Sequence, residues 1–264
     1  MNILRRVPAF IKVADARQSD FHSFRRGRPE RKIDFKIACV LPLHSMNAVD
    51  NDQNFLCLSA APAEMDQFWA DGWRHFGVYF FRYRSATHSD KRFSVMPLRI
   101  DLERFVLSRG QKRVLAKNCG ARIALRPTAI DAEKDALFNH HRQRFKENVP
   151  TSIDQFLSPV PASVPCRNLE LCVYHGEKLV GVTFLDVGQI ATSAVYAIFN
   201  PAETKRSLGI LMMLHSIKFS RENGFRYYYP GYAYHEPFAY DYKKRFRGLE
   251  YLDWEAGWKP YVKG

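Results

Sequence analysis

The segment from Ser193 to Glu250 constrains the fold of this chain more than any other part of it. A short apolar run over residues 194–199 predicts a strand, and Asn200-Pro201 ends it. A basic turn follows, and then apolar residues at helical spacing predict a helix over residues 210–221. The aromatic run over residues 225–229 predicts a second strand. The segment therefore predicts strand, turn, helix and strand, with a polar turn at the start of the helix.

The rest of the chain continues this alternation, which indicates a mixed α/β fold. We expect strands over 36–41, 54–59, 78–84, 93–100, 121–127, 168–174 and 178–186, and helices over 63–76, 110–118 and 131–146. With 264 residues and 46% hydrophobic content, the chain can bury one large core or two modest ones. The expected organisation is a basic extension (1–36), a smaller N-terminal α/β domain (37–118) and a C-terminal domain (119–264).

The charge balance favours a polyanionic partner. The chain has 40 basic and 27 acidic residues, a formal net charge of +13. Such a field concentrates polyanions near the surface, and phosphate neutralisation dominates nucleic-acid binding. Nucleic acid is the leading candidate, and a basic protein without a nucleic-acid partner is the alternative.

The cysteines indicate a reducing compartment and no metal. Five cysteines are scattered without a C-x-x-C pair. A site built from Cys39, His44 and Cys57 is the nearest alternative. His140 and His141 are neighbours on an expected helix and do not face one point, so they predict a surface feature. No apolar run approaches 18 residues and the N-terminus has no apolar signal core, so we expect a cytoplasmic protein without a membrane partner.

The turn before the expected helix is suited to bind phosphate. Lys205-Arg206-Ser207-Leu208-Gly209 lies where free amides and the helix dipole attract an anion. Strand, phosphate-type turn, helix and strand resemble the acyl-donor site of N-acetyltransferase-like (GNAT) folds. An acetyl-CoA enzyme of that fold shows R-x-x-G-x-G or R-x-x-G-x-A, whereas this chain has Leu211 at the small position. We expect that side chain to hinder the approach of a pyrophosphate, which places an acyl-CoA donor second.

Five motifs in order resemble the arginyl-tRNA–protein transferase family. They are LSRGQKRVLAKN, SAVYAIFNP, RSLG, YYYPGY, and Tyr242-Lys243-x-x-Phe246-Arg247-x-x-Glu250, and the likeness runs roughly from residue 102 to 250. The resemblance implies a GNAT-like fold and transfer of arginine from arginyl-tRNA to the N-terminal amine of a protein or peptide, with no further cofactor. Two departures from the family pattern are a missing cysteine cluster before residues 93–99 and Asn200 in place of an aspartate.

The chemistry asks for few groups, because an aminoacyl-tRNA ester is already activated. The amine must be positioned, its proton accepted and an oxyanion stabilised. The candidates for acid–base and positioning roles are Asn200, Glu203, Tyr232 and Glu236. The candidates for tRNA contacts are Lys112, Arg113, Lys117, Arg206, Ser207, Gly209, Lys243 and Arg247. The candidates for the pocket of the 3′-adenosine and aminoacyl group are Tyr196, Tyr229, Gly231, Tyr240 and Tyr242.

Several alternatives stay open from the sequence. Each tyrosine also fits a core position, because aromatic side chains fill cores well. An acyl-CoA-dependent N-acyltransferase and a catalytically weak RNA-binding protein are the competing functions. The acceptor, the general base and the oligomeric state are not specified by these residues.

Overall fold

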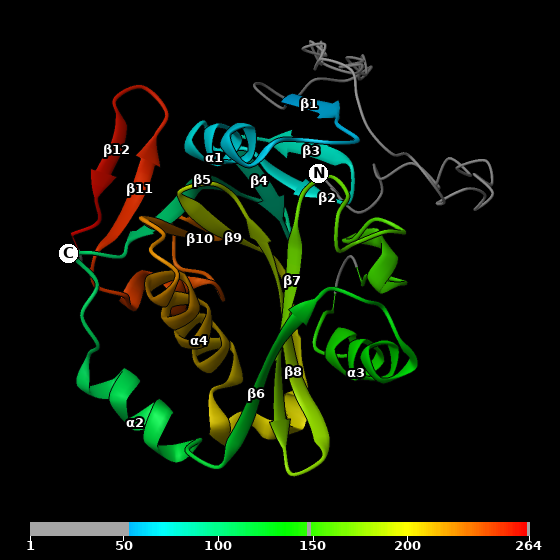
Figure 1. Ribbon diagram of the computed structural model, residues 1–264. Coiled ribbons are helices and arrows are strands. Elements are labelled where there is room, and N and C mark those ends of the chain that lie inside the picture. Colours follow the sequence, from blue (N-terminus) through cyan, green and yellow to red (C-terminus); the bar gives the residue numbers. More distant parts are fainter. Residues whose placement is uncertain (1–52, 147–148, 263–264) are drawn as a thin grey trace, which may run out of the picture.

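The computed structural model describes residues 53–146 and 149–262 (Figure 1). The expected basic extension, the strand over residues 36–41 and two residues of the alternative metal site, Cys39 and His44, lie outside these ranges.

Nine strands of the described chain form the main sheet. Its order is β12-β11-β5-β10-β9-β8-β7-β6, and β4 pairs with β5 off this path. The bounds are β4 Ser85–His88, β5 Lys91–Asp101, β6 Ala121–Pro127, β7 Asn168–His175, β8 Lys178–Val187, β9 Ala191–Phe199, β10 Tyr227–Tyr234, β11 Leu249–Asp253 and β12 Gly257–Pro260. The expected hairpin of β7 and β8 is confirmed.

The strands β9 and β10 stop pairing partway along, and the place where they separate, called the opening below, holds the site. They are parallel, and Ala191–Ser193 pairs with Tyr227–Tyr229. No pairing is recorded between the remainders of these two described strands, and the register of β10 against β5 shifts between Tyr228 and Gly231. Helix α4 (Leu208–Glu222) connects them and packs beside the sheet (Figure 1). The expected GNAT-like fold with strands separating after the first few residues is confirmed.

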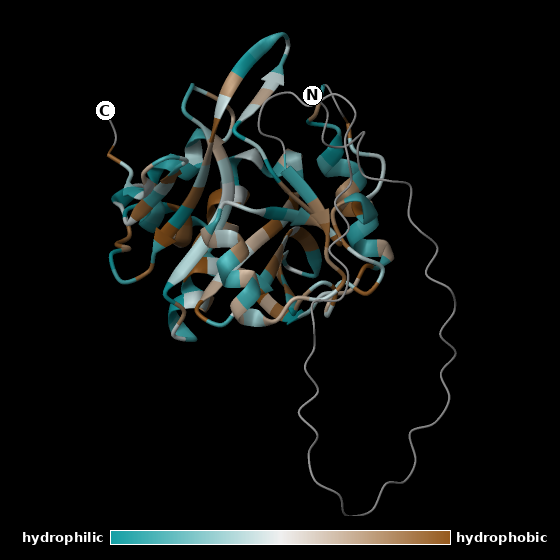
Figure 2. Ribbon diagram, turned by 90° about the horizontal axis from the view of Figure 1, so that it is seen from above, coloured by the Kyte–Doolittle hydropathy of each residue, from teal (hydrophilic) through white to brown (hydrophobic). Residues whose placement is uncertain are grey.

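Helices cover both faces of the sheet. Helix α4 and helix α2 (Arg109–Lys117) lie on one side of β6–β8, and α3 (Ala132–Arg142) lies on the other (Figure 1). Met213, Leu214 and Ile217 of α4 pack on β5 and β10, while Leu137 and Phe138 of α3 pack on β7, β8 and β9. Apolar residues gather along these inner elements, and many outer turns are hydrophilic (Figure 2).

A small sheet replaces the end of one expected helix. Helix α1 spans Pro62–Ala70, not residues 63–76, and Arg74–Phe76 is strand β2. The reason is Gly72, whose φ of +82° ends the helix, with Trp73 N–H donating to the Phe68 carbonyl at 2.8 Å. Strands β1 (Gln53–Leu56) and β3 (Tyr79–Arg82) pair with β2 to complete a three-stranded sheet in the order β1-β3-β2.

The main sheet contains strands from both sides of the expected domain boundary at residues 118 and 119. Strand β5 pairs with β10 and with β11. The domain division itself stays a prediction. Over residues 53–146 and 149–262, no helix has the length and apolar character needed to cross a bilayer.

Candidate active site between two diverging strands

Two cationic side chains reach backbone oxygens in the opening between β9 and β10. Arg74 of β2 donates from Nη2 to the Ala194 carbonyl, one residue past the last paired residue of β9, and from Nη1 to Ser193 Oγ at 2.5 Å. Lys243, in the 3₁₀ turn η4 (Asp241–Arg245), donates from Nζ to the Tyr232 carbonyl at 3.0 Å. These bonds support backbone carbonyls at a place where the two strands no longer pair with each other.

The two cations flank Gly231 and have no carboxylate bound to them. A Cβ atom at Gly231 would lie 3.5 Å from Lys243 Nζ and 3.6 Å from Arg74 Nη2, and its φ is +90°. Neither cation forms an ion pair with a carboxylate within the described ranges. Both side chains are partly buried. A guanidinium has five N–H donors and an ammonium has three, so donors remain for a ligand. The opening is therefore suited to an anionic or electron-rich group.

The environment weakens the proton affinity of Lys243. Desolvation, and then the nearby charge of Arg74, lower the pKa of Lys243 to about 7. Desolvation also lowers the pKa of Arg74, but a guanidinium stays charged at physiological pH. At neutral pH, a substantial fraction of Lys243 is therefore a neutral amine with a free lone pair.

A buried network holds Arg74 in place. The neighbouring His75 is 4% exposed, and its Nε2 and Asp186 Oδ2 are hydrogen-bonded at 2.6 Å. Asn168 Nδ2 donates to the other oxygen of Asp186 at 2.7 Å, and His75 Nδ1 lies 2.8 Å from the Gly77 carbonyl. The network anchors β2 to β8, one residue from the guanidinium in the opening.

Two residues of this network and the neighbouring Cys166 form the group among the described residues that could ligate a metal. His75, Cys166 and Asp186 place one possible ligand atom each within 4.8 Å of one another. Burial, and then the neighbouring Asp186, raise the pKa of the Cys166 thiol, so the thiolate that binds metal is disfavoured. Each side chain already has hydrogen-bond partners, and we read the group as structural. The expectation that no metal is bound stays a prediction.

The N-terminus of α4 faces the open end of the two strands. Ser207 precedes the helix with a left-handed φ of 56°. The first backbone bonds of the helix are donated by Ile210 and Leu211 to the Ser207 carbonyl, so the amides before them lie at its free end. A Cβ atom at Gly209 would lie 3.8 Å from the Phe199 ring and 4.0 Å from the Tyr242 ring. Such a helix end, lined by aromatic rings, is a suitable place for a nucleotide phosphate.

The Arg206 side chain is bound by residues close to it. Its Nε donates to Glu203 Oε2 at 2.7 Å, and its Nη2 lies 2.9 Å from His175 Nε2. The carbonyl of Arg206 accepts a bond from Asn118 Nδ2 at 3.0 Å, which links the C-terminal end of α2 to this turn. The exposed basic residues of α2 are Arg109 and the three that were expected to contact tRNA: Lys112, Arg113 and Lys117. Arg206 and these lysine and arginine residues thus belong to adjoining parts of the surface.

Aromatic residues and one further arginine line the open end of the site. Tyr196 stacks on Phe156 with ring centroids 3.7 Å apart, and its buried hydroxyl has no hydrogen-bond partner among the described residues. Tyr240 and Tyr242 are partly buried. The exposed Arg144 stands over the Phe199 ring at 4.7 Å. Nothing in the sequence distinguished Arg144 from the other basic residues at the end of its expected helix.

Other expected site residues form hydrogen bonds with backbone groups or pack in the core. Asn200 accepts from the Ala202 amide at 3.0 Å and caps the turn after β9. Tyr232 donates its hydroxyl to the Gly72 carbonyl at 2.6 Å, and Glu236 accepts from the Ser94 amide at 2.8 Å. Tyr229 is buried against Trp69 and Trp258 in the core on the α1 side, and Arg247 is exposed. The functional roles expected for these residues stay predictions.

Two sequence-based interpretations are wrong. Leu211 is 1% exposed and packs in the core with Leu208 and Met212, so its side chain does not obstruct a ligand at the helix end. His141 is 2% exposed, not a surface residue, and its Nδ1 accepts from the Phe199 amide at 3.1 Å. Leu211 was interpreted from its position in a motif and His141 from its neighbour His140. Neither argument shows which face of the helix is buried.

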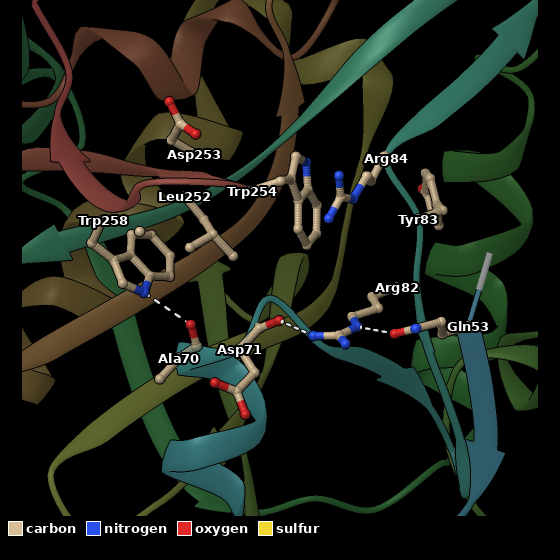
Figure 3. Close-up of a pocket in the computed structure, with 11 residues that line it drawn as sticks. Gln53, Ala70, Asp71, Arg82, Tyr83, Arg84, Leu252, Asp253, Trp254 and Trp258 are labelled. Carbon is tan, nitrogen blue, oxygen red and sulfur yellow. Dashed lines mark hydrogen bonds between the residues drawn. The ribbon is translucent and has the colours of Figure 1, made fainter. Parts of the chain in front are cut away.

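A separate open pocket of about 500 Å³ lies between α1, β3 and the β11–β12 hairpin (Figure 3). Its walls include Arg82, Arg84, Trp254 and Trp258, and both indole N–H groups are held by backbone carbonyls. Trp254 also covers Gly72, where a Cβ atom would lie 3.1 Å from its ring. Because the Gly72 carbonyl holds Tyr232, the pocket wall supports the opening from outside.

Comparison with known proteins places the chain in a family. Residues 133–253 match the model described as arginine-tRNA-protein transferase, C terminus. The chain is 30% identical to an aspartate/glutamate leucyltransferase of Vibrio parahaemolyticus over 223 residues, 83% of this chain and 86% of the relative. It is also 30% identical over 186 residues to the enzyme of that description in Helicobacter hepaticus, covering 69% of this chain and 76% of the relative.

Solved structures with a similar arrangement are more distant. The C-terminal domain of a putative lysylphosphatidylglycerol synthetase from Agrobacterium fabrum has a TM-score of 0.42 and 14% identity, covering 53% of this chain and 46% of that chain. FemX has a TM-score of 0.42 and 10% identity, covering 67% and 61%. The relationship rests on the sequence matches, which extend over the opening and α4: this chain belongs to the aminoacyl-tRNA–protein transferase family.

Proposed function

We propose that this enzyme transfers leucine from leucyl-tRNA to the N-terminal amine of a protein or peptide that begins with aspartate or glutamate. The observation that carries the proposal is Arg74, a guanidinium with no carboxylate partner among the described residues, held at the place where β9 and β10 separate. The family membership supplies the reaction class, and the charge of the opening supports the choice of substrates.

The positive charge of the opening favours a neutral donor side chain over arginine. An arginyl group next to Arg74 would bring like charges together in a poorly solvated place, which is unfavourable. A leucyl group carries no side-chain charge and suits the aromatic residues nearby. The relatives from Helicobacter hepaticus and Vibrio parahaemolyticus are described as leucyltransferases. The arginine donor expected from the sequence is the alternative that the experiment below tests.

An acidic acceptor residue complements Arg74. A guanidinium binds a carboxylate in a planar, paired geometry, and such charge-assisted bonds are about twice as strong as neutral ones. The relatives are described as acting with aspartate or glutamate. An acceptor side chain bound to Arg74 would place its own α-amine a few bonds away from the carboxylate, within the opening.

We assign the tRNA to the side of α4 and α2. The free amides and the dipole at the start of α4 suit a phosphate of the 3′ end, and the exposed cations of α2 extend the positive surface. Tyr240 and Tyr242 suit the terminal adenine, as base–aromatic stacking contributes about 1–3 kcal/mol per base. The aminoacyl-tRNA is the co-substrate, and we propose no further cofactor. We propose that the reaction takes place in the cytoplasm.

The chemistry then consists of positioning and proton transfer. The α-amine attacks the ester carbonyl, the C–N bond forms, and the bond from the carbonyl carbon to the ribose oxygen breaks. The remaining N–H donors of Arg74 suit either the acceptor carboxylate or negative charge on the reacting carbonyl. Holding amine and ester together removes much of the entropic barrier to reaction.

A transfer assay with labelled donors tests this function. We expect label to pass from leucyl-tRNA to a peptide beginning with Glu, with far less transfer to the matched peptide beginning with Gln. Arginyl-tRNA and acetyl-CoA serve as the competing donors on the same peptides. Transfer from arginyl-tRNA with no transfer from leucyl-tRNA would overturn the choice of donor, and acylation from acetyl-CoA alone would overturn the reaction class.

A further inference from the structure

We propose that Lys243 is the general base of the transfer, and that its Nζ accepts the proton of the attacking α-amine. This assignment rests on the proposed function and adds a catalytic residue to it. It gives Lys243 a role different from the phosphate contact expected from the sequence.

The position of Lys243 is the first argument. Its Nζ lies 3.0 Å from the Tyr232 carbonyl and 3.5 Å from the place where a Cβ atom of Gly231 would be. Because residue 231 is glycine, no side chain separates Lys243 Nζ from the backbone of β10 where the two strands part. A lysine directed at a tRNA phosphate would extend into solvent, whereas this side chain is partly buried and bonded to the backbone of β10.

The protonation state of Lys243 is the second argument. An ordinary lysine is almost wholly protonated at neutral pH and cannot accept a proton. Desolvation and the charge of Arg74 lower the pKa of Lys243 to about 7, which is near the optimum for a general base at physiological pH. One N–H group bonds to the Tyr232 carbonyl, and the lone pair of the neutral amine stays available.

The other titratable groups around Lys243 do not change charge near pH 7. Arg74 of β2 remains a cation, and Tyr232 of β10 has its pKa raised by desolvation. Burial also raises the pKa values of Tyr242 and of Tyr240, whose ring centroid lies 5.1 Å from Lys243 Nζ. The lysine is therefore the group in this set that titrates in the working range of the enzyme.

The carboxylates first considered for this role are engaged elsewhere. Glu203 forms an ion pair with Arg206, and Glu236 accepts the Ser94 amide. Among the described residues, neither carboxylate forms a hydrogen bond or an ion pair with Arg74 or Lys243, which flank Gly231. Against the opposing effect of desolvation, hydrogen bonds from the Glu236 and Ser94 amides lower the pKa of Glu236, which makes this carboxylate a weak proton acceptor.

The step balances without another reactant. The neutral α-amine forms a bond to the ester carbon, and its proton moves to Lys243 Nζ. The electrons of the carbon–oxygen ester bond leave with the ribose oxygen. That oxygen takes a proton from the Lys243 ammonium, which yields the free 3′ end of the tRNA, the new amide and the neutral lysine.

The substitution Lys243→Arg separates a base from a mere positive charge. Arginine keeps the charge but does not lose its proton below pH 12. We expect kcat to fall by about 10²-fold or more, in line with the usual contribution of general-base catalysis. The KM of the acceptor peptide should change little. In the wild-type enzyme kcat should rise with pH through an apparent pKa near 7, and the variant should lack that rise. Lys244→Arg, beside it and ion-paired with Asp241, should keep wild-type kcat and its pH profile.

A measurement that does not depend on activity accompanies the kinetics. The acetylation rate of Lys243 by trace acetic anhydride, followed by mass spectrometry over pH 5–11, reports its pKa in the folded wild-type protein. We expect half-maximal reactivity near pH 7. A value above 9, or a Lys243→Arg enzyme that retains the wild-type kcat and its pH profile, would refute the proposal while leaving the transfer reaction itself intact. A wild-type enzyme with no transfer from any aminoacyl-tRNA would instead refute the function.

Discussion

Arg74 and Ser193 are joined by a hydrogen bond of 2.5 Å between Nη1 and Oγ, although 119 positions separate them in the sequence. The bond ties β2 of the small sheet to β9 at the last residue that pairs with β10. It places the guanidinium at the point where the two strands begin to separate. The N-terminal elements thus contribute a charged group to an opening built by the C-terminal part of the chain.

The substitution Arg74→Lys tests the role of this guanidinium. An ammonium has three donors and no planar fork, so it cannot serve Ser193, Ala194 and both oxygens of a carboxylate together. We expect kcat/KM with a Glu peptide to fall at least ten-fold and the preference for Glu over Gln to shrink. The exposed Arg221→Lys should behave as wild type. A variant that keeps its preference for Glu would show that another group binds the acidic side chain.

The substitution Tyr196→Phe separates a ligand contact from a packing role. The Tyr196 hydroxyl is buried without a partner in the described part of the chain, so its removal should leave the free energy of unfolding unchanged or raise it by about 1 kcal/mol. If the hydroxyl contacts the aminoacyl group, kcat/KM should fall several-fold at the same time. Denaturant unfolding and the transfer assay give the two numbers. Unchanged kinetics would remove Tyr196 from the site.

His141 should make stability depend on pH in a defined window. Desolvation, and then Arg144, lower the pKa of His141 to about 4, below its ordinary value of 6.5. The unfolded chain therefore binds this proton more tightly, and the stabilisation present above pH 6.5 is lost as pH falls from there to 4. We expect a loss of about 2–3 kcal/mol between pH 7 and 4.5.

The substitution His141→Asn should remove most of that dependence. Its side-chain oxygen can still accept the Phe199 amide, and it does not titrate. Urea unfolding of both proteins at pH 7 and at pH 4.5 measures the difference. Equal losses for wild type and variant would show that other groups cause the acid sensitivity.

The substitution Gly72→Ala should destabilise the protein by about 2–4 kcal/mol, from the positive φ and from overpacking. Gly72 has a φ of +82°, and an added Cβ would lie 2.8 Å from Leu252 Cδ2. Gly176→Ala is the matched control, because its φ is +59° with no atom within 4 Å of the added Cβ. We expect about 1–2 kcal/mol there, from strain alone. Similar losses at both positions would mean that Leu252 and Trp254 move aside readily.

Removal of the exposed cations of helix α2 should change the salt dependence of tRNA binding. If Lys112, Arg113 and Lys117 each contact a phosphate, replacing all three by Ala should reduce the slope of log K against log salt by about 2–3. A variant with Lys91 and Arg92, exposed on the β4–β5 hairpin, replaced by Ala should keep the slope. Fluorescence titrations at several salt concentrations provide the measurement. An unchanged slope would move the tRNA away from α2.

Local patterns in the sequence were sufficient for most elements near the site. The alternating and apolar runs of β7, β8 and β9 and the helical spacing of α4 reflect which side chains face a core. The end of helix α1 at Gly72 was not predicted, because a single glycine can be tolerated within a helix. The segment Arg74–Phe76 was therefore assigned to the helix and not to strand β2. The ordered motifs also identified the family, because they lie on the strand–helix–strand unit that builds the opening.

The tertiary structure alone decided which charges meet in that opening. Arg74 lies far from β9 in the sequence, and nothing in its neighbourhood distinguished it from the other 39 basic residues. Lys243 was found by its motif, but its altered pKa depends on desolvation and on Arg74, which are properties of the packed molecule. Sequence spacing determines secondary structure because backbone geometry is local, whereas the proton affinity of a side chain depends on all the groups that folding brings around it.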